Sequence, residues 1–407
     1  MVGRGSLSRD SEGGAAGSRP VVILFSSAYL DDHLWTNKQH VATRLASYGE
    51  VLFVEPGLSL PILVRRLREF RWLDLLPDRA HSSGMRVLSP WFLLFRRGPR
   101  FLRSLCFRLL SAWIRWRLKG VPGRRVLLVY HPAGVELVGP LGPDRVIYDC
   151  VDDLATQPHF KGRPDLGQLI QEQEQTLIRT ADLVISTSST LHARNQNQAR
   201  RAVLIENVGD FDHFSRVARD SNDPDPFPHI PRPRIGFAGA LDPYKLDYDL
   251  LEILARELDP VPLVLIGPRS TVETNLRLET LEQRENVFSI GSVAFSEMPT
   301  LLGGLDVHIL PYALNEHTRY IFPIKFFECM ATGRPVVVSA LESLSAYRDV
   351  CPAARTPEEW VLRIREALAD GSTGRDQRVD LASRHTWNDR VRRIREEIAR
   401  LLDDCPP

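Results

Sequence analysis

Cysteine is scarce in this sequence, and long apolar runs are missing. The five cysteines, at positions 106, 150, 329, 351 and 405, are odd in number and form no C-x-x-C pair. This pattern argues against a disulfide framework or a structural zinc site and fits a reducing compartment. No stretch reaches the roughly 18 uncharged apolar residues that a membrane-spanning helix needs, and no apolar segment follows the charged start as in a signal peptide. We therefore expect a cytoplasmic chain without a transmembrane helix.

An excess of charge of one sign is also missing. The 52 Lys and Arg residues nearly balance the 51 Asp and Glu residues, which leaves a net charge of +1. This balance gives no global basic surface for nucleic acid. The 407 residues, 43% of them hydrophobic, are enough for two domains with their own cores. Residues 1–20 are rich in Gly, Ser, Arg and Ala, which predicts a disordered tail.

Strand and helix patterns alternate along the chain in two blocks. Short apolar runs predict buried parallel strands at 21–25, 51–54, 125–130, 145–148, 182–187, 202–205, 234–237, 263–266, 286–290, 307–310 and 335–339. Helical patterns lie between them at 40–48, 166–180, 248–258 and 322–332. A Pro-rich stretch separates the two blocks. We predict an α/β fold of two tandem Rossmann-like, doubly wound domains that face a cleft.

The predicted boundaries follow from this alternation. They are a first domain at 21–215, a linker at 216–233, a second domain at 234–383 and a C-terminal helix at 384–407. The terminal helix is charged and carries Trp387 near its start. A terminal helix with a single Trp packs at a specific place, and we expect this one to cross back to the first domain.

One run in the second block carries a specific motif. After the strand at 307–310 comes a loop, and then PIKFFECMATGRPVV from Pro323 onward. This run resembles the group 1 glycosyltransferases, often called family 4, which have the GT-B fold. The resemblance extends to GFAG at 236–239, Gly267, NVFSIG at 286–291 and IENVGDFDHF at 205–214. It implies a nucleoside-diphosphate sugar as donor and retention of the anomeric configuration.

The motif also has a physical interpretation. A helix that begins near Pro323 presents free N–H groups and the positive end of its dipole, a natural seat for a pyrophosphate. Lys325 lies in the first turn, where the dipole alone disfavours a cation, so an anion in the site would explain it. Glu328, at i+3, lies on the same face and can accept both ribose hydroxyls, the role that the resemblance implies. The alternative is an exposed Lys325–Glu328 ion pair with no ligand.

The chain departs from the family at one position. Many members carry a second Glu eight residues before the one that matches Glu328, and that Glu is associated with the transferred sugar. Tyr320 stands there in this sequence, and Glu316 lies in the same loop at another spacing. The departure keeps open a non-catalytic nucleotide-sugar-binding protein as an alternative function.

Further donor-site residues follow the first two strands of the second block. Gly239 closes the GFAG turn, and Lys245 follows it in the sequence DPYK. Gly267 ends the next strand, and Arg269 comes two residues later. The family often places a basic residue after the first turn, so Lys245 is the candidate partner of the donor phosphates and Arg269 a weaker one. On their own, both would be solvated surface charges.

The first block supplies candidates for the acceptor side. The loop at 26–37 lacks the glycines of a phosphate cradle and offers His33 and Trp35, which suit sugar stacking and hydroxyl binding. His131 follows another strand. Asp152 and Asp153 follow the strand at 145–148, where Asp149 also lies. These carboxylates fit either a metal-binding D-x-D or an acceptor-side base in a metal-free enzyme.

The tandem domains favour the metal-free alternative, in which Lys325 and the helix dipole neutralise the diphosphate, so that no metal and no other cofactor is expected. Asp153 as a helix cap, and the 26–37 loop as a plain polar surface loop, are the structural alternatives.

Residues 90–120 contain no acidic residue and form a basic amphipathic pattern. At helical spacing one face collects the apolar residues Leu102, Leu105, Cys106, Leu109, Trp113 and Trp116. Basic residues fall opposite, namely Arg100, Arg108, Arg115 and Lys119, and Arg65, Arg66, Arg68 and Arg71 precede them. This pattern favours peripheral contact with an anionic membrane surface, which would suit a lipid-linked acceptor. A helix packed on the sheet with snorkelling Arg side chains is the alternative.

Together these patterns predict a metal-independent glycosyltransferase with a sugar or lipid-linked acceptor, such as a cell-surface polysaccharide precursor. A nucleotide-sugar 2-epimerase of similar fold is the enzymatic alternative. A dehydrogenase is disfavoured because neither block opens with a dinucleotide fingerprint.

Overall fold

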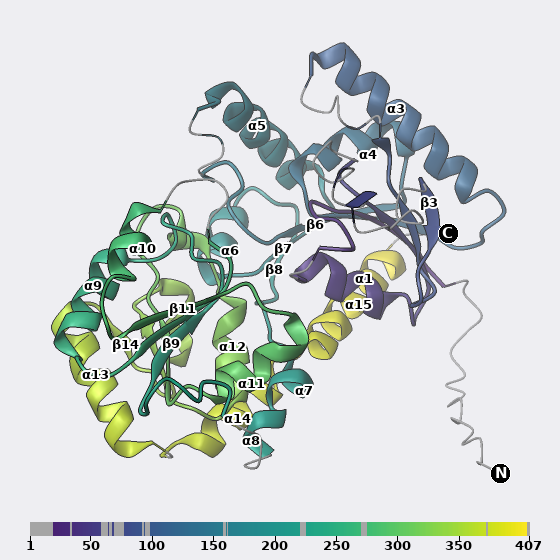
Figure 1. The fold of residues 1–407 in the computed structure, drawn as a ribbon. Coiled ribbons are helices and arrows are strands. Elements are labelled where there is room, and N and C mark those ends of the chain that lie inside the picture. Colours follow the sequence, from purple (N-terminus) through teal and green to yellow (C-terminus); the bar gives the residue numbers. More distant parts are fainter. Residues whose placement is uncertain are drawn as a thin grey trace, which may run out of the picture.

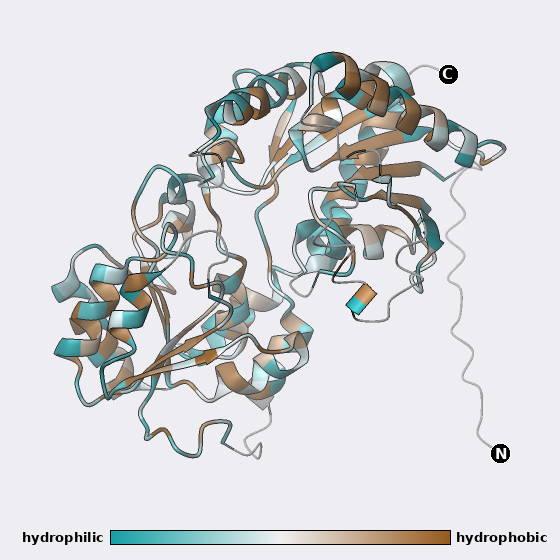
Figure 2. Cartoon of the chain, turned by 45° about the horizontal axis from the view of Figure 1, so that its top comes forward, coloured by the Kyte–Doolittle hydropathy of each residue, from teal (hydrophilic) through white to brown (hydrophobic). Residues whose placement is uncertain are grey.

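The chain folds into two α/β domains, shown side by side in Figure 1. The computed structural model describes residues 19–32, 35–57, 64, 67–68, 77–91, 93, 98–157, 160, 162–219, 225–269, 275–371 and 373–404. The predicted tail lies outside the described residues except for Arg19 and Pro20. Figure 2 shows that hydrophobic residues follow the strands and the sheet-facing sides of the helices in both domains. The two sheets confirm the predicted tandem of Rossmann-like domains.

The described part of the first domain is built on a sheet in the order β3-β4-β2-β1-β5-β6-β7-β8, with only β3 antiparallel to its neighbour. The strands are β1 (Val21–Phe25), β2 (Glu50–Val54), β3 (Asp78–Ala80), β4 (Arg86–Leu88), β5 (Arg125–Val129), β6 (Arg145–Cys150), β7 (Leu183–Ser186) and β8 (Ala202–Leu204). The helices are α1 (Asn37–Leu45), α3 (Arg100–Arg117), α4 (Val135–Leu141), α5 (Pro164–Thr180), α6 (Ser189–Asn195), α7 (Phe211–Phe214) and α8 (Arg216–Arg219).

The described part of the second domain has a parallel sheet in the order β11-β10-β9-β12-β13-β14. The strands are β9 (Ile235–Ala238), β10 (Leu263–Ile266), β11 (Val287–Gly291), β12 (Val307–Leu310), β13 (Val336–Ser339) and β14 (Ala353–Ala354). The helices are α9 (Tyr248–Glu257), α10 (Leu276–Leu281), α11 (Met298–Gly303), α12 (Ile324–Ala331), α13 (Pro357–Asp370) and α14 (Arg375–Ser383), and α15 (Trp387–Asp403) follows them.

The strand order reverses once in the middle of each sheet. β1 lies between β2 and β5, and β9 lies between β10 and β12. Open α/β sheets bind ligands beyond the carboxyl ends of the strands at such a reversal. In the first domain the loops after these strands carry Trp35 and His131, and in the second they carry Lys245 and the turn that leads into α12. The fold therefore places the candidate residues of both domains at their ligand-binding edges.

The C-terminal helix α15 belongs to the core of the first domain. Its apolar side chains Val391, Ile394 and Ile398 are buried together with residues of α1 and of the first sheet. Figure 1 shows α15, in yellow, beside α1, in purple. The predicted crossing of the terminal helix back to the first domain is therefore confirmed.

Helix α3 differs from the predicted amphipathic pattern. Its buried face consists of Cys106, Phe107, Leu110, Ser111 and Ile114. The predicted apolar face is therefore split, because Cys106 enters the core whereas other members of that face are exposed, namely Leu105, Leu109 and Trp116. The helical period identifies apolar positions, but it does not say which of them the sheet will cover. The structure thus leaves α3 with a second apolar stripe outside the core.

Among the described helices, none has the length and hydropathy needed to cross a membrane.

Candidate active site

The candidate donor site begins at the first turn of α12. Pro323 is the N-cap of this helix rather than its first helical residue, and no side chain caps the helix by a hydrogen bond. The backbone N–H groups of the first turn therefore lack a side-chain acceptor, and the positive end of the dipole lies at the loop that follows β12. This is the local geometry that an anion seat requires.

Lys325 and Glu328 form an ion pair on this helix. Lys325 Nζ lies 2.7 Å from Glu328 Oε2, and the side chains are 20% and 6% exposed. Lys325 Nζ also lies 5.8 Å from the ring centre of Phe214, which precedes the second domain. The i, i+3 spacing is also the one expected for an exposed Lys325–Glu328 ion pair without a ligand. The Glu328 carboxylate is buried, however, so the observed pair is not the solvent-exposed pair of that alternative. Burying a carboxylate costs free energy, which one lysine partner only partly offsets.

Gly239 and Gly267 meet at the carboxyl ends of β9 and β10. Gly267 has a φ of +142°, and a Cβ added there would lie 2.0 Å from the carbonyl oxygen of Gly239. The Gly239 N–H donates to the carbonyl of Ile266 at 2.8 Å. Only glycine fits such a close backbone approach. The two predicted glycines therefore form one tight corner beneath the loop that carries Lys245.

Lys245 and Arg269 have different surroundings. Lys245 Nζ lies 3.3 Å from Asp242 Oδ2, and its backbone carbonyl accepts from the Ala313 N–H at 2.8 Å, which joins its loop to the loop after β12. Arg269 is 55% exposed and lies 2.5 Å from a carboxylate oxygen of Glu282. Both basic residues predicted for the donor phosphates thus have a carboxylate partner, and they differ in burial, because the Lys245 side chain is only 30% exposed.

The three aspartates at the end of β6 and in the loop after it have different surroundings. Asp149 is fully buried, and both of its carboxylate oxygens accept from Nη2 of Arg390, which gives it a structural role. Asp152 accepts from the Asp153 N–H at 2.9 Å and from Gln157 Nε2 at 3.3 Å. Burial raises the pKa of Asp153, although Arg194 at 3.3 Å opposes this shift. Asp152 and Asp153 remain the candidates for acceptor-side chemistry.

Asp152 lies where the two domains meet. Thr156 Oγ1, in the same loop, is 3.4 Å from Nδ1 of His317 in the second domain. Burial lowers the pKa of His317, and the charge of Asp152 opposes this shift. Burial likewise lowers the pKa of Lys38, again opposed by Asp152. We call the region around Asp152, Lys38, His317, Lys245 and the first turn of α12 the interdomain site.

A chain of two asparagines joins the starts of α1 and α12. Asn37 Nδ2 donates to Asn207 Oδ1 at 2.9 Å, and Asn207 Nδ2 donates to the carbonyl of Phe322 at 2.8 Å. Lys38 is the second residue of α1, and Lys325 is the second residue of α12. Two helix N-termini, each with a lysine in its first turn, are therefore held together across the domains.

Of the other predicted acceptor residues, His131 and Trp35 contact neighbouring residues of the first domain. His131 Nδ1 accepts from the Ala133 N–H at 3.0 Å and caps a short turn. The Trp35 ring packs edge-on against His40 at 5.4 Å, and His40 stacks on Trp387 at 4.3 Å. His33 lies outside the described residues. Contact of these three residues with an acceptor stays a prediction.

Comparison with known proteins supports the fold and the motif. The family model described as Glycosyl transferases group 1 matches residues 232–370. The chain is 28% identical over 401 residues to TuaH of Bacillus subtilis, which is assigned as a glycosyltransferase of teichuronic acid biosynthesis, with 92% of this chain and 95% of that protein covered. The chain is an enzyme that transfers sugars and has the GT-B fold, and its residues 232–370 match the group 1 glycosyltransferases.

Solved structures resemble the transferase at the level of the fold. Sucrose-phosphate synthase of Thermosynechococcus elongatus has a TM-score of 0.69 at 13% identity, over 95% of this chain and all, 100%, of that chain. HepE of Anabaena, in complex with UDP-glucose, has a TM-score of 0.62 at 15% identity, over 93% of this chain and 99% of that chain.

Within the described part of the transferase, no group of three or more His, Cys, Asp or Glu side chains is arranged to hold a metal ion.

Sequence reasoning missed Lys38 and Arg194. Lys38 carried a signal, because a lysine in the first turn of a helix opposes the dipole, as Lys325 does. Arg194 carried none, since its partners Glu174 and Asp153 come from other segments of the chain.

Proposed function

We propose that this transferase moves a sugar from a nucleoside-diphosphate sugar to a hydroxyl of an acceptor. The observation that carries the proposal is the start of α12, where the half-buried Lys325 and, one turn later, the buried Glu328 lie beside an N-terminus that no side chain caps. Such a turn suits a diphosphate and an adjacent ribose. The likeness in fold to HepE, whose structure holds UDP-glucose, supports this donor class.

The charges of the site suit the departure of a diphosphate. The acceptor oxygen forms a bond to the anomeric carbon while the bond from that carbon to the diphosphate oxygen breaks. The α12 dipole, Lys325 and Lys245 stabilise the negative charge that develops on the leaving group. Asp152 or Asp153 lies on the opposite domain and orients the acceptor hydroxyl, whose proton passes to the departing diphosphate oxygen.

The proposal includes retention of the anomeric configuration and independence from a metal. The α12 dipole, Lys325 and Lys245 supply the positive charge that a metal ion would otherwise supply. These three groups, together with the group 1 motif, support retention and metal independence. The product's anomeric configuration, read from its NMR coupling constant, separates retention from an inverting reaction in which an aspartate acts as base. Unchanged transfer after treatment with a chelator is the expected result for metal independence.

The test of the proposed function is release of nucleoside diphosphate from a panel of nucleotide sugars, with and without acceptors. Release that depends on an acceptor supports the transferase. Isomerisation of the sugar without an acceptor would support the epimerase. Binding of the donor with no release in any condition would support a non-catalytic binding protein. A matched pair of variants, Glu328→Ala in α12 and Glu366→Ala in α13, separates loss of the site from loss of an ordinary ion pair.

A membrane-associated acceptor is supported by the outer face of α3. The large apolar side chains of this face are Phe101, Leu105, Leu109 and Trp116, which are 70%, 52%, 50% and 69% exposed. Exposed basic residues flank them, namely Arg100, Arg108, Arg115 and Lys119. Of the arginines predicted to precede this region, Arg68 is exposed, whereas Arg65, Arg66 and Arg71 lie outside the described residues.

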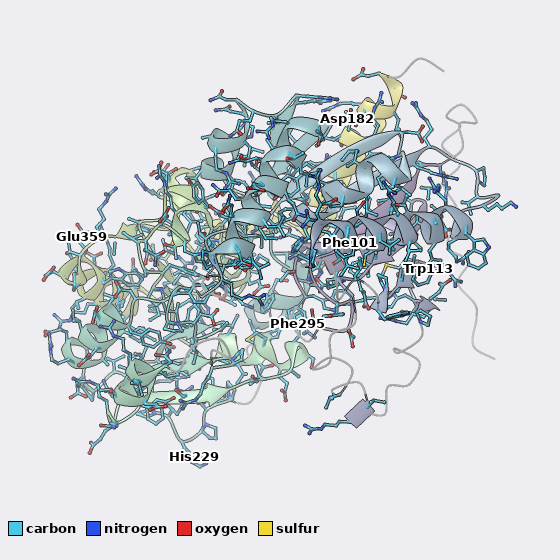
Figure 3. The ribbon with its side chains drawn as sticks, turned by 90° about the horizontal axis from the view of Figure 1, so that it is seen from above. Phe101, Trp113, Asp182, His229, Phe295 and Glu359 are labelled. Carbon is cyan, nitrogen blue, oxygen red and sulfur yellow. The ribbon has the colours of Figure 1, made fainter. Side chains whose placement is uncertain are left out.

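Helix α3 lies on the side of the first domain that is away from the second domain (Figure 1). Figure 3 labels Phe101 and Trp113 on the same helix. Apolar side chains flanked by arginines, in a segment without acidic residues, suit an anionic bilayer surface on the cytoplasmic side. We propose that α3 rests on such a surface and that the acceptor is a lipid-linked precursor of a cell-surface polysaccharide. The similarity to TuaH supports this class of acceptor.

Sedimentation with lipid vesicles tests this contact. The transferase is expected to bind vesicles that contain phosphatidylglycerol, more weakly at high salt, and to ignore vesicles of phosphatidylcholine alone. The double variant Phe101→Ser/Trp116→Ser should lose binding. The control Leu362→Ser, at an exposed leucine of the second domain, should keep it. Equal binding by all three proteins, or binding to neither kind of vesicle, would refute the membrane contact.

A further inference from the structure

Tyr320 stands eight residues before Glu328, where the resemblance to the group 1 enzymes implies a glutamate, and the structure shows what surrounds it. Its ring packs against the hydrophobic core of the first domain, although the residue belongs to the second domain. The guanidinium carbon of Arg194, in α6 of the first domain, lies 5.3 Å from the centre of the ring. This is the geometry of a cation–π contact. Tyr320 is therefore a contact between the domains.

The backbone on either side of the ring is held by the same helix. Ser188 Oγ, at the start of α6, donates to the carbonyl of Tyr320 at 2.8 Å. Thr190 Oγ1 donates to the carbonyl of Arg319 at 2.9 Å. Three side chains of one short segment thus fix the turn at 318–320, which leads directly into α12 and the Lys325–Glu328 pair.

Arg194 continues the contact to the acceptor side. Its guanidinium lies 3.3 Å from an oxygen of Asp153 and 3.1 Å from Glu174. Asp153 in turn donates its N–H to Asp152 at 2.9 Å. Arg194 therefore contacts both the ring of Tyr320, in the turn before the donor helix, and the acceptor-side carboxylate of Asp153.

We propose that Tyr320 and Arg194 form a clamp that sets the Asp152–Asp153 loop in register with the donor helix when the two domains dock. Tyr320 is a positioning residue, and it acts through the face of its ring. The inference rests on the proposed function for its kinetic consequences but not for the contact itself.

The kinetic test compares Tyr320→Phe and Tyr320→Leu with wild type. Phenylalanine keeps the ring face, so its kcat should stay within about twofold of wild type. Leucine removes the face, and kcat should fall about ten- to a hundredfold, as expected for a small misplacement of reacting groups. The donor KM should change little, and the share of donor lost to water should rise because closure excludes water. Leu314→Ser, at an exposed position of the same loop, is the control.

Two outcomes would overturn the clamp. Equal losses in Tyr320→Phe and Tyr320→Leu would mean that the hydroxyl contacts a substrate. No loss in Tyr320→Leu would mean that the contact has no role in positioning. In a double-mutant cycle with Arg194→Lys, which keeps the charge, the two changes should be strongly non-additive, and simple additivity would contradict a shared role.

Hydrogen exchange keeps this test separate from the proposed function. If the clamp exists, Tyr320→Leu should speed amide exchange in residues 150–157 of the other domain, whether or not any sugar is transferred. Tyr320→Phe should leave this exchange unchanged. Normal exchange in Tyr320→Leu would refute the clamp, whereas absence of transfer by wild type would refute only the proposed function.

Discussion

Arg390 and Asp149 form a fully buried, two-bonded ion pair between the C-terminal helix and β6, with donor–acceptor distances of 2.8 and 2.7 Å. Asp149 lies three residues before Asp152 in the sequence. It therefore anchors α15 to the strand that delivers the acceptor-side carboxylates to the interdomain site.

Removing one partner of this pair leaves a buried charge without compensation. Arg390→Met should lower the free energy of unfolding by about 3–5 kcal/mol. The control is Arg392→Met on the same helix, because Arg392 is exposed and pairs with Glu396 at the surface, where the loss should be much smaller. Urea denaturation of the two variants measures the difference. Similar small losses in both would contradict a structural role for the buried pair.

The corner between Gly239 and Gly267 should tolerate no side chain. Gly267→Ala combines a positive φ with a severe clash against Gly239, so both stability and donor affinity should fall. Gly291→Ala is the matched control, because Gly291 has a φ of +73° but nothing within 4 Å of an added Cβ. It should cost only about 1–2 kcal/mol of backbone strain. Melting temperatures and nucleotide titrations compare the two, and equal effects would show that strain alone, rather than the close approach, matters at this corner.

His40 should make the fold sensitive to acid. Burial, with a smaller effect from Arg44, lowers its pKa from 6.5 to about 3. Between these two pKa values the unfolded chain therefore binds more protons than the folded chain. The stability that the neutral, buried His40 contributes is complete above pH 6.5 and is lost as the pH falls toward 3. His40→Phe keeps a ring against Trp387 and removes the titration. Its melting temperature should drop less than that of wild type on acidification, and an identical drop would contradict this role.

Lys245 and Arg269 should differ in their effect on the donor. Lys245→Met should weaken binding of a nucleoside diphosphate by about tenfold, the effect of losing one favourable charge interaction of roughly 1.4 kcal/mol. Arg269→Met should change it much less, because the Arg269 side chain is 55% exposed and its charge is screened by water, whereas the Lys245 side chain is 30% exposed. Calorimetric titration of both variants decides between them. Equal losses would mean that Arg269 leaves Glu282 when the donor binds.

The strands were predictable because their signal is local. Short apolar runs such as those of β1, β10 and β13 are buried on both faces of a parallel sheet and stand out from their surroundings. The Lys325–Glu328 contact was predictable for the same reason, since the two residues are three positions apart on one helix. The short edge strand β14, with two residues, carries too little pattern to be recognised.

Contacts between distant segments could not be predicted. Asp149 looked like a candidate base until the fold supplied Arg390, which lies 241 residues away in the chain. The departure at Tyr320 was visible, but its partner Arg194 comes from another domain. On α3, Cys106 and Leu105 both fit the helical period of the predicted apolar face. Only the position of the sheet decides that Cys106 is buried and Leu105 is exposed.

The central claim is that the first turn of α12 binds the donor's nucleoside diphosphate, and direct calorimetric titration tests it most simply. UDP, GDP, ADP and TDP would be titrated without metal into wild type, Glu328→Ala and the control Glu366→Ala, which breaks an exposed pair of the same spacing. We predict that one nucleotide binds wild type and the control equally and that Glu328→Ala binds it at least about tenfold more weakly. Equal binding by all three proteins, or binding of no nucleotide by wild type, would contradict the account.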